Sequence, residues 1–305
     1  MLQTEEHFGG VRAMAYWQDM KASIRRRFEF IEFQLNWEGS VGRRKLQDQF
    51  AISMQQATND LNAYLDVCPN NMLYDPRRKA YVPGPKFRPR LTSGEVSEYL
   101  MHLDMLHQGY RSESEIWVDA LPAYDAVSTQ TRKINPGTLK LMLWAIRAQS
   151  CIIARYVSLS SDNLKPRTLR PHAIASDGHR WHARAFDFGQ NRYSDFVLSR
   201  LEVAEPVEPP TQHLPSDDAW NTCVEIVLKP GTGLEKQQRA VLEVEYGMTD
   251  GCLRLRVRKA MLWYYLRHYG FNPDDIDGDT FRNKSSFHLM VSNLKEVERC
   301  LGRRG

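Results

Sequence analysis

GSVGRRKLQDQFAISMQQATNDLNAYL, residues 39–65, is the stretch that decides the fold of the N-terminal part of this chain. Its pattern predicts a helix over residues 43–50, a turn at 51–52 and a second helix capped by Ser53. A serine at this position accepts hydrogen bonds from the free backbone N–H groups of the first helical turn. The apolar residues of the second helix recur at helical spacing, at Met54, Ala57, Leu61 and Leu65. This arrangement is typical of a helix-turn-helix.

The opposite face of the second predicted helix carries amide and hydroxyl side chains. Such groups exchange hydrogen bonds with base edges and phosphate oxygens, so the helix is suited to the major groove of DNA. A solvated helix pair in an all-α core is the alternative. The residues expected to contact DNA in this region are Arg25, Arg43, Arg44, Ser53, Gln55, Gln56, Thr58 and Asn59.

A hairpin with a cationic tip is predicted directly after the two helices. Strand-like segments at residues 72–74 and 80–82 flank a turn that contains Arg77, Arg78 and Lys79. Beside a recognition helix, such a hairpin is the wing of a winged helix-turn-helix. We therefore expect these three cations to contact backbone phosphate, and we assign residues 1–90 to a DNA-binding domain.

Composition limits the class of protein. The chain has 305 residues, of which 42% are hydrophobic, enough for two or three globular domains and unlike a disordered protein. No apolar run approaches the roughly 20 residues of a membrane span, and the N-terminus lacks the features of a signal peptide. We expect a cytoplasmic protein that associates with the nucleoid when it binds DNA. The positive surplus lies in residues 1–90 and 151–202, so two regions are expected to meet anions.

The candidate motifs for catalysis, metal binding and cofactor binding each lack a residue or a spacing that the function requires. The five cysteines are odd in number and scattered without a C-x-x-C, which predicts neither a disulfide framework nor a zinc site. Gly231-Thr232-Gly233 lacks the third glycine of a dinucleotide loop, and the acids at 274–279 lack EF-hand spacing. We expect no enzyme activity, no metal and no cofactor.

Helical periodicity extends on both sides of the winged segment. Apolar residues predict a helix over 16–36 before it. After it, the T-x-x-E form at 92–95 predicts a capping box at the start of a helix, and another helix follows Pro136. We assign residues 91–150 to a helical connector that joins domains or forms a dimer contact.

From residue 151 the apolar period changes to two, and strands are predicted over 152–158, 180–186 and 196–201. In the strand RWHARAFD the face with Trp181 is apolar, while the other face carries Arg180, His182 and Arg184. This cationic row needs counter-anions, either internal carboxylates such as Asp187 and Asp195 or a bound ligand. The alternative is a barrel exterior with scattered surface arginines.

Residues 203–218 contain four prolines and clustered acids, which predicts a linker. Beyond it, strands at 222–228 and 252–258 alternate with helices, so residues 219–305 predict a small α+β module. Arg254, Arg256 and Arg258 alternate on one face of the second strand.

The segment from Ile152 to Leu201, with RWHARAFD and DFVLSRL, resembles a WYL domain of the BrxR/CapW type of transcriptional regulator. FAISMQQATNDLNAY and YDPRRKAYV are similar to the winged helix of these regulators, and the resemblance covers nearly the whole chain. Trp181 matches the tryptophan of the family motif, whereas His182 and Ala183 stand where many relatives have Tyr and Leu. The resemblance implies an α+β multidomain fold in which residues 151–202 form an Sm/SH3-like β-barrel and 219–305 a WCX-like domain.

The resemblance also implies a homodimeric repressor of a phage-defence operon, whose WYL domain senses a nucleotide or nucleic-acid effector. The residues expected to bind this effector are Tyr156, Ser158, Arg167, His172, Trp181, His182, Arg184 and Arg200. We expect the dimer to bind an inverted-repeat operator in double-stranded DNA, with no membrane partner. The alternatives are a protein that binds single-stranded nucleic acid and modulates a nuclease or helicase, and a transcriptional activator of the same fold.

Overall fold

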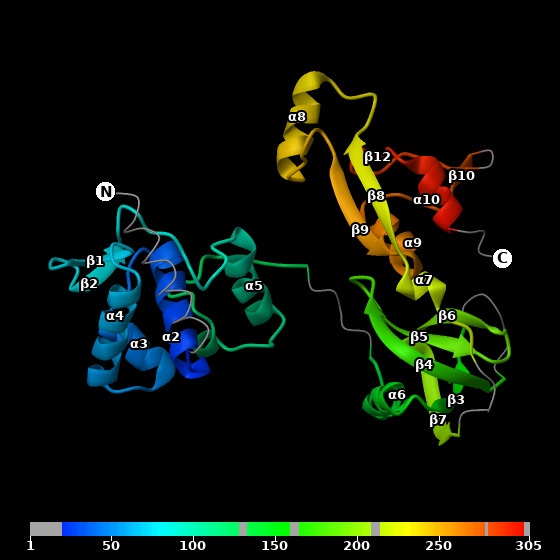
Figure 1. Ribbon diagram of the computed structural model, residues 1–305, viewed down its shortest axis with the longest axis horizontal. Coiled ribbons are helices and arrows are strands. Elements are labelled where there is room, and N and C mark those ends of the chain that lie inside the picture. Colours follow the sequence, from blue (N-terminus) through cyan, green and yellow to red (C-terminus); the bar gives the residue numbers. More distant parts are fainter. Residues whose placement is uncertain (1–19, 128–132, 159–164, 209–213, 278–279, 302–305) are drawn as a thin grey trace, which may run out of the picture. The chain divides into compact units, whose positions relative to one another are not determined.

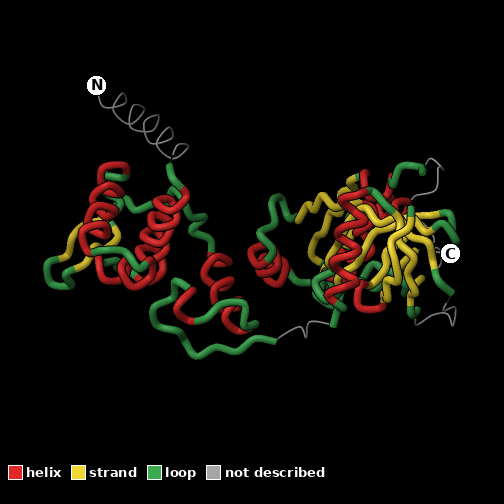
Figure 2. Tube along the Cα trace, turned by 90° about the horizontal axis from the view of Figure 1, so that it is seen from below, coloured by secondary structure: helices red, strands yellow, loops and turns green. Residues whose placement is uncertain are grey.

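The computed structural model describes residues 20–127, 133–158, 165–208, 214–277 and 280–301. The chain forms two compact units, residues 1–128 and 129–305, shown in Figure 1. Helices predominate over strands in the described N-terminal unit, and strands are concentrated in the second (Figure 2). Across the described residues, no helix has the length and apolar character needed to cross a membrane.

The N-terminal unit is a helical bundle with a hairpin. Its elements are α2 (Ala22–Phe33), the π-helix η1 (Gln34–Glu38), α3 (Arg43–Phe50), α4 (Met54–Val67), β1 (Met72–Asp75), β2 (Ala80–Pro83), α5 (Val96–His107) and η2 (Glu113–Glu115). The predicted helix over 16–36 is observed from Ala22, and the part of it before residue 20 lies outside the described residues.

The helix-turn-helix is confirmed in detail. Helix α3 has the predicted bounds, and Ala51 ends it in the left-handed region with φ of 51°. The Ser53 hydroxyl accepts from the backbone N–H of Gln56, so it caps α4 as expected. Leu46 of α3 and Leu61 of α4 are buried in one core together with Phe28 of α2.

The wing is also confirmed. Strands β1 and β2 pair antiparallel, and Tyr81 forms a further bridge with Val41, which ties the hairpin to the segment before α3. At the tip, the Asp75 carboxylate accepts from the backbone N–H groups of Arg77 and Arg78. The Val41–Tyr81 bridge therefore fixes the base of the wing, and the Asp75 carboxylate holds the turn at its tip.

The predicted connector does not form one structural group. Leu103 of α5 and Trp117 pack into the core of the N-terminal unit, whereas the helix after Pro136 belongs to the second unit. The predicted capping box is wrong, because α5 begins at Val96 and the Thr92 backbone N–H donates to the buried carboxylate of Glu32.

The first half of the second unit is a curved antiparallel sheet covered by a helix. Its elements are α6 (Pro136–Ala148), β3 (Cys151–Tyr156), β4 (Arg167–Ser176), β5 (Trp181–Asp187), β6 (Arg192–Val197), η3 (Leu198–Arg200) and β7 (Leu201–Val207). The strand order is β6-β5-β4-β3-β7, and the register shifts at Ile153/Ala154 and at Pro171/Ala173. Bulges of this kind bend a sheet. Met142 and Ala145 of α6 share one core with the buried side chains of the sheet.

Three expectations for this half need correction. The strand predicted over 196–201 is instead the end of β6, the 3-10 helix η3 and the first residue of β7. The sequence pattern does not predict strand β4, although it lies in the middle of the sheet. Strand β7 continues to Val207, so part of the predicted linker over 203–218 pairs with β3. Prolines are tolerated here because β7 is an edge strand.

The second half is a three-stranded sheet flanked by helices. Its elements are α7 (Asp218–Asn221), β8 (Cys223–Pro230), α8 (Lys236–Glu245), β9 (Leu253–Arg258), η4 (Lys259–Met261), α9 (Leu262–His268), β10 (Ile276–Asp277), β11 (Thr280–Phe281), β12 (Leu289–Val291) and α10 (Leu294–Leu301). The main sheet has the order β12-β8-β9. Leu228, Leu262 and Leu266 lie in its core.

Candidate functional site

The solvent-facing side of α4 carries the predicted amide side chains. Gln55, Gln56 and Asn59 are exposed and Thr58 is half-buried. The Gln55 amide donates to Asn59 Oδ1 at 3.1 Å, and the Thr58 hydroxyl donates to the carbonyl of Met54 at 2.9 Å. These intrahelical bonds hold the side chains against the helix and leave further donors and acceptors open to a partner.

Met54 differs from its prediction. The spacing places it in the buried stripe, but its side chain is 48% exposed, and the buried stripe begins at Ala57. Its place at the first turn of α4 is where a recognition helix contacts base edges, and an apolar side chain there suits the methyl group of thymine. Sequence spacing misses this because the exposed end of a stripe has the same period as its buried part.

A buried ion pair fixes the position of α4. Arg27 of α2 donates to both carboxylate oxygens of Asp60, at 2.6 and 3.0 Å, and both side chains are nearly inaccessible. The Gln56 amide donates to the same carboxylate at 2.9 Å. Arg27, a member of the arginine run at 25–27, is therefore structural, and it orients one of the candidate DNA-contacting side chains through Asp60.

The other predicted cations of this unit are exposed. Arg25 pairs with Glu29 at 3.0 Å on the surface of α2. Arg43 and Arg44 lie in the first turn of α3, where the helix dipole disfavours positive charge. Arg44 pairs at 3.7 Å with Asp48, and both side chains are exposed. An anion placed at this helix start would relieve that unfavourable arrangement.

The wing tip presents Arg77, Arg78 and Lys79, all exposed. Arg78 pairs with Asp75 at a distance of 3.8 Å between Nε and the carboxylate oxygen. A pair this long and exposed contributes little. The cations of the wing are therefore available to contact phosphate.

In the predicted cationic face of β5, His182 and Arg184 are buried, whereas Arg180, which directly precedes the strand, is half-buried. The Arg184 side chain donates to both oxygens of Asp217, at 2.7 and 3.0 Å, and to Asp195 at 3.0 Å. The counter-anions are thus internal carboxylates. Asp195 is among those expected, whereas Asp217 lies in the segment predicted as a linker.

Asp217 joins the two halves of the second unit. It caps α7 by accepting from the Trp220 N–H, and its carboxylate lies 2.9 Å from His172 Nε2. Burial alone would raise the pKa of Asp217, but the hydrogen bonds from His172 and Arg184 hold this pKa well below its usual value. An aspartate at the N-cap position with a second acid in the first turn is the helix-start signal that sequence reasoning did not use.

Several expected effector-binding residues already have internal partners. Arg167 donates to the buried carboxylate of Asp187 at 2.6 Å. Tyr156 packs edge-on against Phe196, with ring centroids 5.2 Å apart. Trp181, expected on the apolar face, is instead 54% exposed at the start of β5. The remaining residues of β5 are buried because the strand is covered on both faces.

Two of the expected effector-binding residues line different cavities. His182 lines a cavity of about 520 Å³, while His172 lines a separate one of about 370 Å³ beside Tyr193. Ser158 follows the end of β3, and Arg200 lies in η3.

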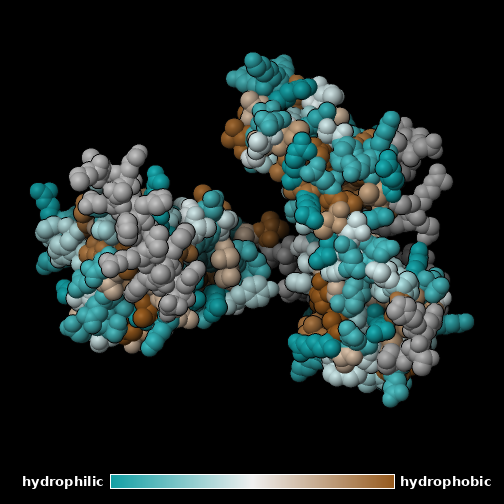
Figure 3. Space-filling model, in the orientation of Figure 1, coloured by the Kyte–Doolittle hydropathy of each residue, from teal (hydrophilic) through white to brown (hydrophobic). Residues whose placement is uncertain are grey.

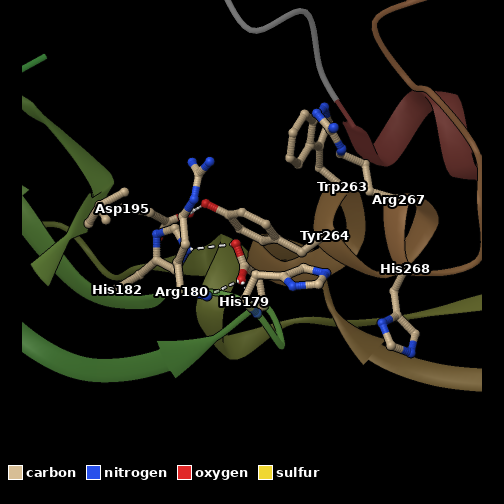
Figure 4. Close-up of a pocket in the computed structure, with 10 residues that line it drawn as sticks. His179, Arg180, His182, Asp195, Trp263, Tyr264, Arg267 and His268 are labelled. Carbon is tan, nitrogen blue, oxygen red and sulfur yellow. Dashed lines mark hydrogen bonds and ion pairs between the residues drawn. The ribbon is translucent and has the colours of Figure 1, made fainter. Parts of the chain in front are cut away.

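The cavity of about 520 Å³ that His182 lines lies between the β4–β5 turn, strands β5 and β6, and helix α9 (Figure 4). His182 Nε2 is hydrogen-bonded to the Asp177 carboxylate at 3.0 Å, and its ring centroid lies 5.0 Å from that of Tyr264. Its Nδ1 is buried and has no hydrogen-bond partner in the described residues.

Comparison with protein families identifies three matching segments. Residues 23–105 match the BrxR transcriptional regulator winged helix-turn-helix domain, residues 137–206 the WYL domain, and residues 223–297 the BrxR transcriptional regulator C-terminal dimerization domain. The WYL match includes α6, in agreement with the packing of that helix on the sheet.

Comparison with curated proteins finds relatives along most of the chain. The DNA-binding transcriptional repressor CapW of Stenotrophomonas maltophilia is 35% identical over 90% of this chain and 91% of its own. The repressors of the same name from Escherichia coli (strain KTE188) and Pseudomonas aeruginosa are 34% and 33% identical, over 89% and 90% of this chain and 90% of their own lengths.

Proposed function

Because this chain belongs to the family of the CapW DNA-binding transcriptional repressors, we propose that it is a sequence-specific DNA-binding repressor that acts as a homodimer. The observation that carries the proposal is the exposed amide face of α4 beside the exposed cations of the wing. Amides recognise base edges and the cations contact phosphate, which together supply specificity and affinity.

The proposed dimer is supported by the second unit. Its C-terminal part matches a dimerization domain, and α8 in that part presents Val241 and Val244 at 62% and 84% exposure. Figure 3 shows hydrophobic surface over this helix among hydrophilic surroundings. Two copies related by a two-fold axis would place two α4 helices on the two halves of an inverted repeat.

We further infer that the operator controls a phage-defence operon, and that an effector bound in the WYL domain alters DNA binding. The resemblance of the chain to BrxR/CapW regulators supports both inferences. On the same basis, we interpret the curved sheet as a partly open Sm/SH3-like barrel and residues 219–305 as the WCX-like domain. An effector changes DNA binding only if it binds the DNA-competent and DNA-incompetent states with different affinity.

Fluorescence anisotropy with a duplex from the region upstream of the gene tests the function. The Gln56→Ala, Asn59→Ala double variant should lose at least about tenfold in affinity, since two base-contacting amides are removed. Gln108→Ala, which removes an exposed amide outside α4, should bind like wild type. Equal binding by wild type and the double variant would refute the recognition helix, and a preference for single strands would favour an accessory nucleic-acid-binding role.

A further inference from the structure

We propose that the cavity between the β4–β5 turn and α9 binds a ligand that joins a phosphate group to an aromatic ring, either a free nucleoside monophosphate or the 5′-phosphorylated end of a single strand. The inference rests on the function proposed above, because it assigns a location and a chemical class to the effector. It places the site on residues from both halves of the second unit, and of the residues expected from the family resemblance only His182 lines it.

Two arginines from different elements supply the positive charge. Arg180 precedes β5 and is half-buried, and Arg267 lies at the end of α9. Within the described parts of the chain, no carboxylate lies within 4.0 Å of either guanidinium group. Arg267 is exposed, so the cost of an unpaired and partly desolvated cation applies to Arg180. A phosphate would supply a counter-charge to both arginines through the paired N–H groups of the guanidinium.

The two acids of the cavity are already engaged. Asp177 is hydrogen-bonded to His182 Nε2 and accepts from the backbone N–H groups of His179 and Arg180. Asp195 accepts from Arg184 and, at 3.2 Å, from the hydroxyl of Tyr264. Both carboxylates are thus already hydrogen-bonded within the fold, so the polar groups that remain open to an anionic ligand include the two guanidinium groups.

Aromatic rings supply the second half of the recognition. Trp263 and Tyr264, adjacent on α9, line the cavity with ring centroids 5.4 Å apart. Arg267 lies over the Trp263 ring at 4.7 Å, which orients its guanidinium group (Figure 4). Aromatic faces next to arginine groups suit a nucleobase and its phosphate. A volume of about 520 Å³ is in the range of small-molecule sites.

A ligand here would contact both halves of the second unit. Tyr264 connects them directly, since its hydroxyl meets Asp195 of β6 and its ring meets His182 of β5. The half that carries Tyr264 matches the dimerization domain. Occupation of the cavity can therefore favour one arrangement of that domain relative to the sheet, which is what an effector of a dimeric repressor must do.

Isothermal titration calorimetry of the full chain tests the site with adenosine 5′-monophosphate, adenosine, and a single-stranded hexanucleotide with and without a 5′-phosphate. Wild type should bind the phosphorylated probes at least about tenfold more tightly than their unphosphorylated counterparts. Arg180→Gln and Arg267→Gln should each weaken that binding by a similar factor. Arg192→Gln, at an exposed arginine of β6 outside the cavity, should not.

Circular dichroism checks that each variant is folded, and the comparison of probes on wild type needs no variant at all. If the phosphorylated strand binds more tightly than the mononucleotide, the ligand is the end of a single strand. If the mononucleotide binds more tightly, the ligand is a free nucleotide. Equal affinity of wild type for phosphorylated and unphosphorylated probes, or unchanged binding in both arginine variants, would overturn the assignment. Operator binding by the unliganded protein is measured separately, so failure of the repressor function is distinguished from failure of the cavity.

Discussion

At the scale of single residues, buried acids decide how the functional surfaces are held. Glu32 accepts from the backbone N–H groups of residues 90–92, Asp60 holds Arg27 and Gln56, and Asp217 holds Arg184 and His172. Each carboxylate connects segments that are distant in the sequence. Buried ionic groups of this kind cost more when one partner is removed than they contribute as a pair.

The Arg27–Asp60 pair gives the first prediction. Asp60→Ala leaves the Arg27 guanidinium buried without a counter-charge, which is expected to destabilise the N-terminal unit by about 3–5 kcal/mol. Urea denaturation followed by circular dichroism measures the change. The exposed acid Asp66 on the same helix is the control, and Asp66→Ala should change stability by less than about 0.5 kcal/mol. A decrease of equal size in both variants would contradict a specific role for the pair.

The depressed pKa of Asp217 gives the second prediction. A carboxyl whose pKa is lower in the folded than in the unfolded state stabilises the fold above the unfolded value and loses this contribution as pH falls below it. The second unit should therefore lose stability below about pH 4, where unfolded aspartate takes up its proton. Asp217→Asn should be less stable at neutral pH and show a weaker dependence on acid. Thermal unfolding at a series of acidic to neutral pH values measures both effects, and parallel pH curves for the two proteins would exclude the role of Asp217.

At the scale of elements, the wing and α4 present different chemical groups to DNA. The wing is fixed at its base by the Val41–Tyr81 bridge and exposes cations at its tip, while α4 exposes neutral amides. Phosphate contacts set affinity and its dependence on salt, whereas base contacts set specificity. The two elements should therefore respond differently to substitution.

Replacement of Arg77, Arg78 and Lys79 by alanine is expected to weaken binding to operator and unrelated duplexes to a similar degree. The slope of log affinity against log salt concentration should become shallower by about 0.9 for each phosphate that the wing no longer neutralises. Anisotropy titrations at several salt concentrations provide the slope. The Gln56→Ala, Asn59→Ala variant serves as comparison, because its salt slope should match that of wild type. An unchanged slope in the wing variant would show that the wing does not bind phosphate.

At the scale of the whole molecule, two compact units carry two different surfaces. The N-terminal unit holds the candidate DNA-binding face, and the second unit holds the cavity and the dimerization domain. Within the second unit, the Arg184–Asp217 ion pair and the Tyr264–Asp195 hydrogen bond join the sheet to the half that follows it. In the proposed function, this polar connection is where ligand binding in the cavity would reach the dimerization domain.

The exposed face of α8 gives the prediction for the assembly. Val244→Asp places a charge on a side chain that is 84% exposed in one copy, so the isolated chain should fold normally. If α8 forms the dimer interface, the charge is buried there and the dimer should dissociate at least about tenfold more readily. Sedimentation equilibrium measures the constant, and Glu245→Gln on the same helix is the control. An unchanged dimer in Val244→Asp would place the interface elsewhere.

The sequence by itself determined the local elements of the N-terminal unit. The bounds of α3, the cap at Ser53 and the wing hairpin follow from periodicity, capping and turn chemistry, which act over a few residues. Only the tertiary structure decided which charges are neutralised inside the fold. Arg27 and Arg184 are each buried against an acid 33 positions away in the chain, and no local pattern pairs either arginine with that acid. The cavity beside α9 could not be predicted for the same reason, because side chains that meet across a sheet and a distant helix leave no periodic signal along the sequence.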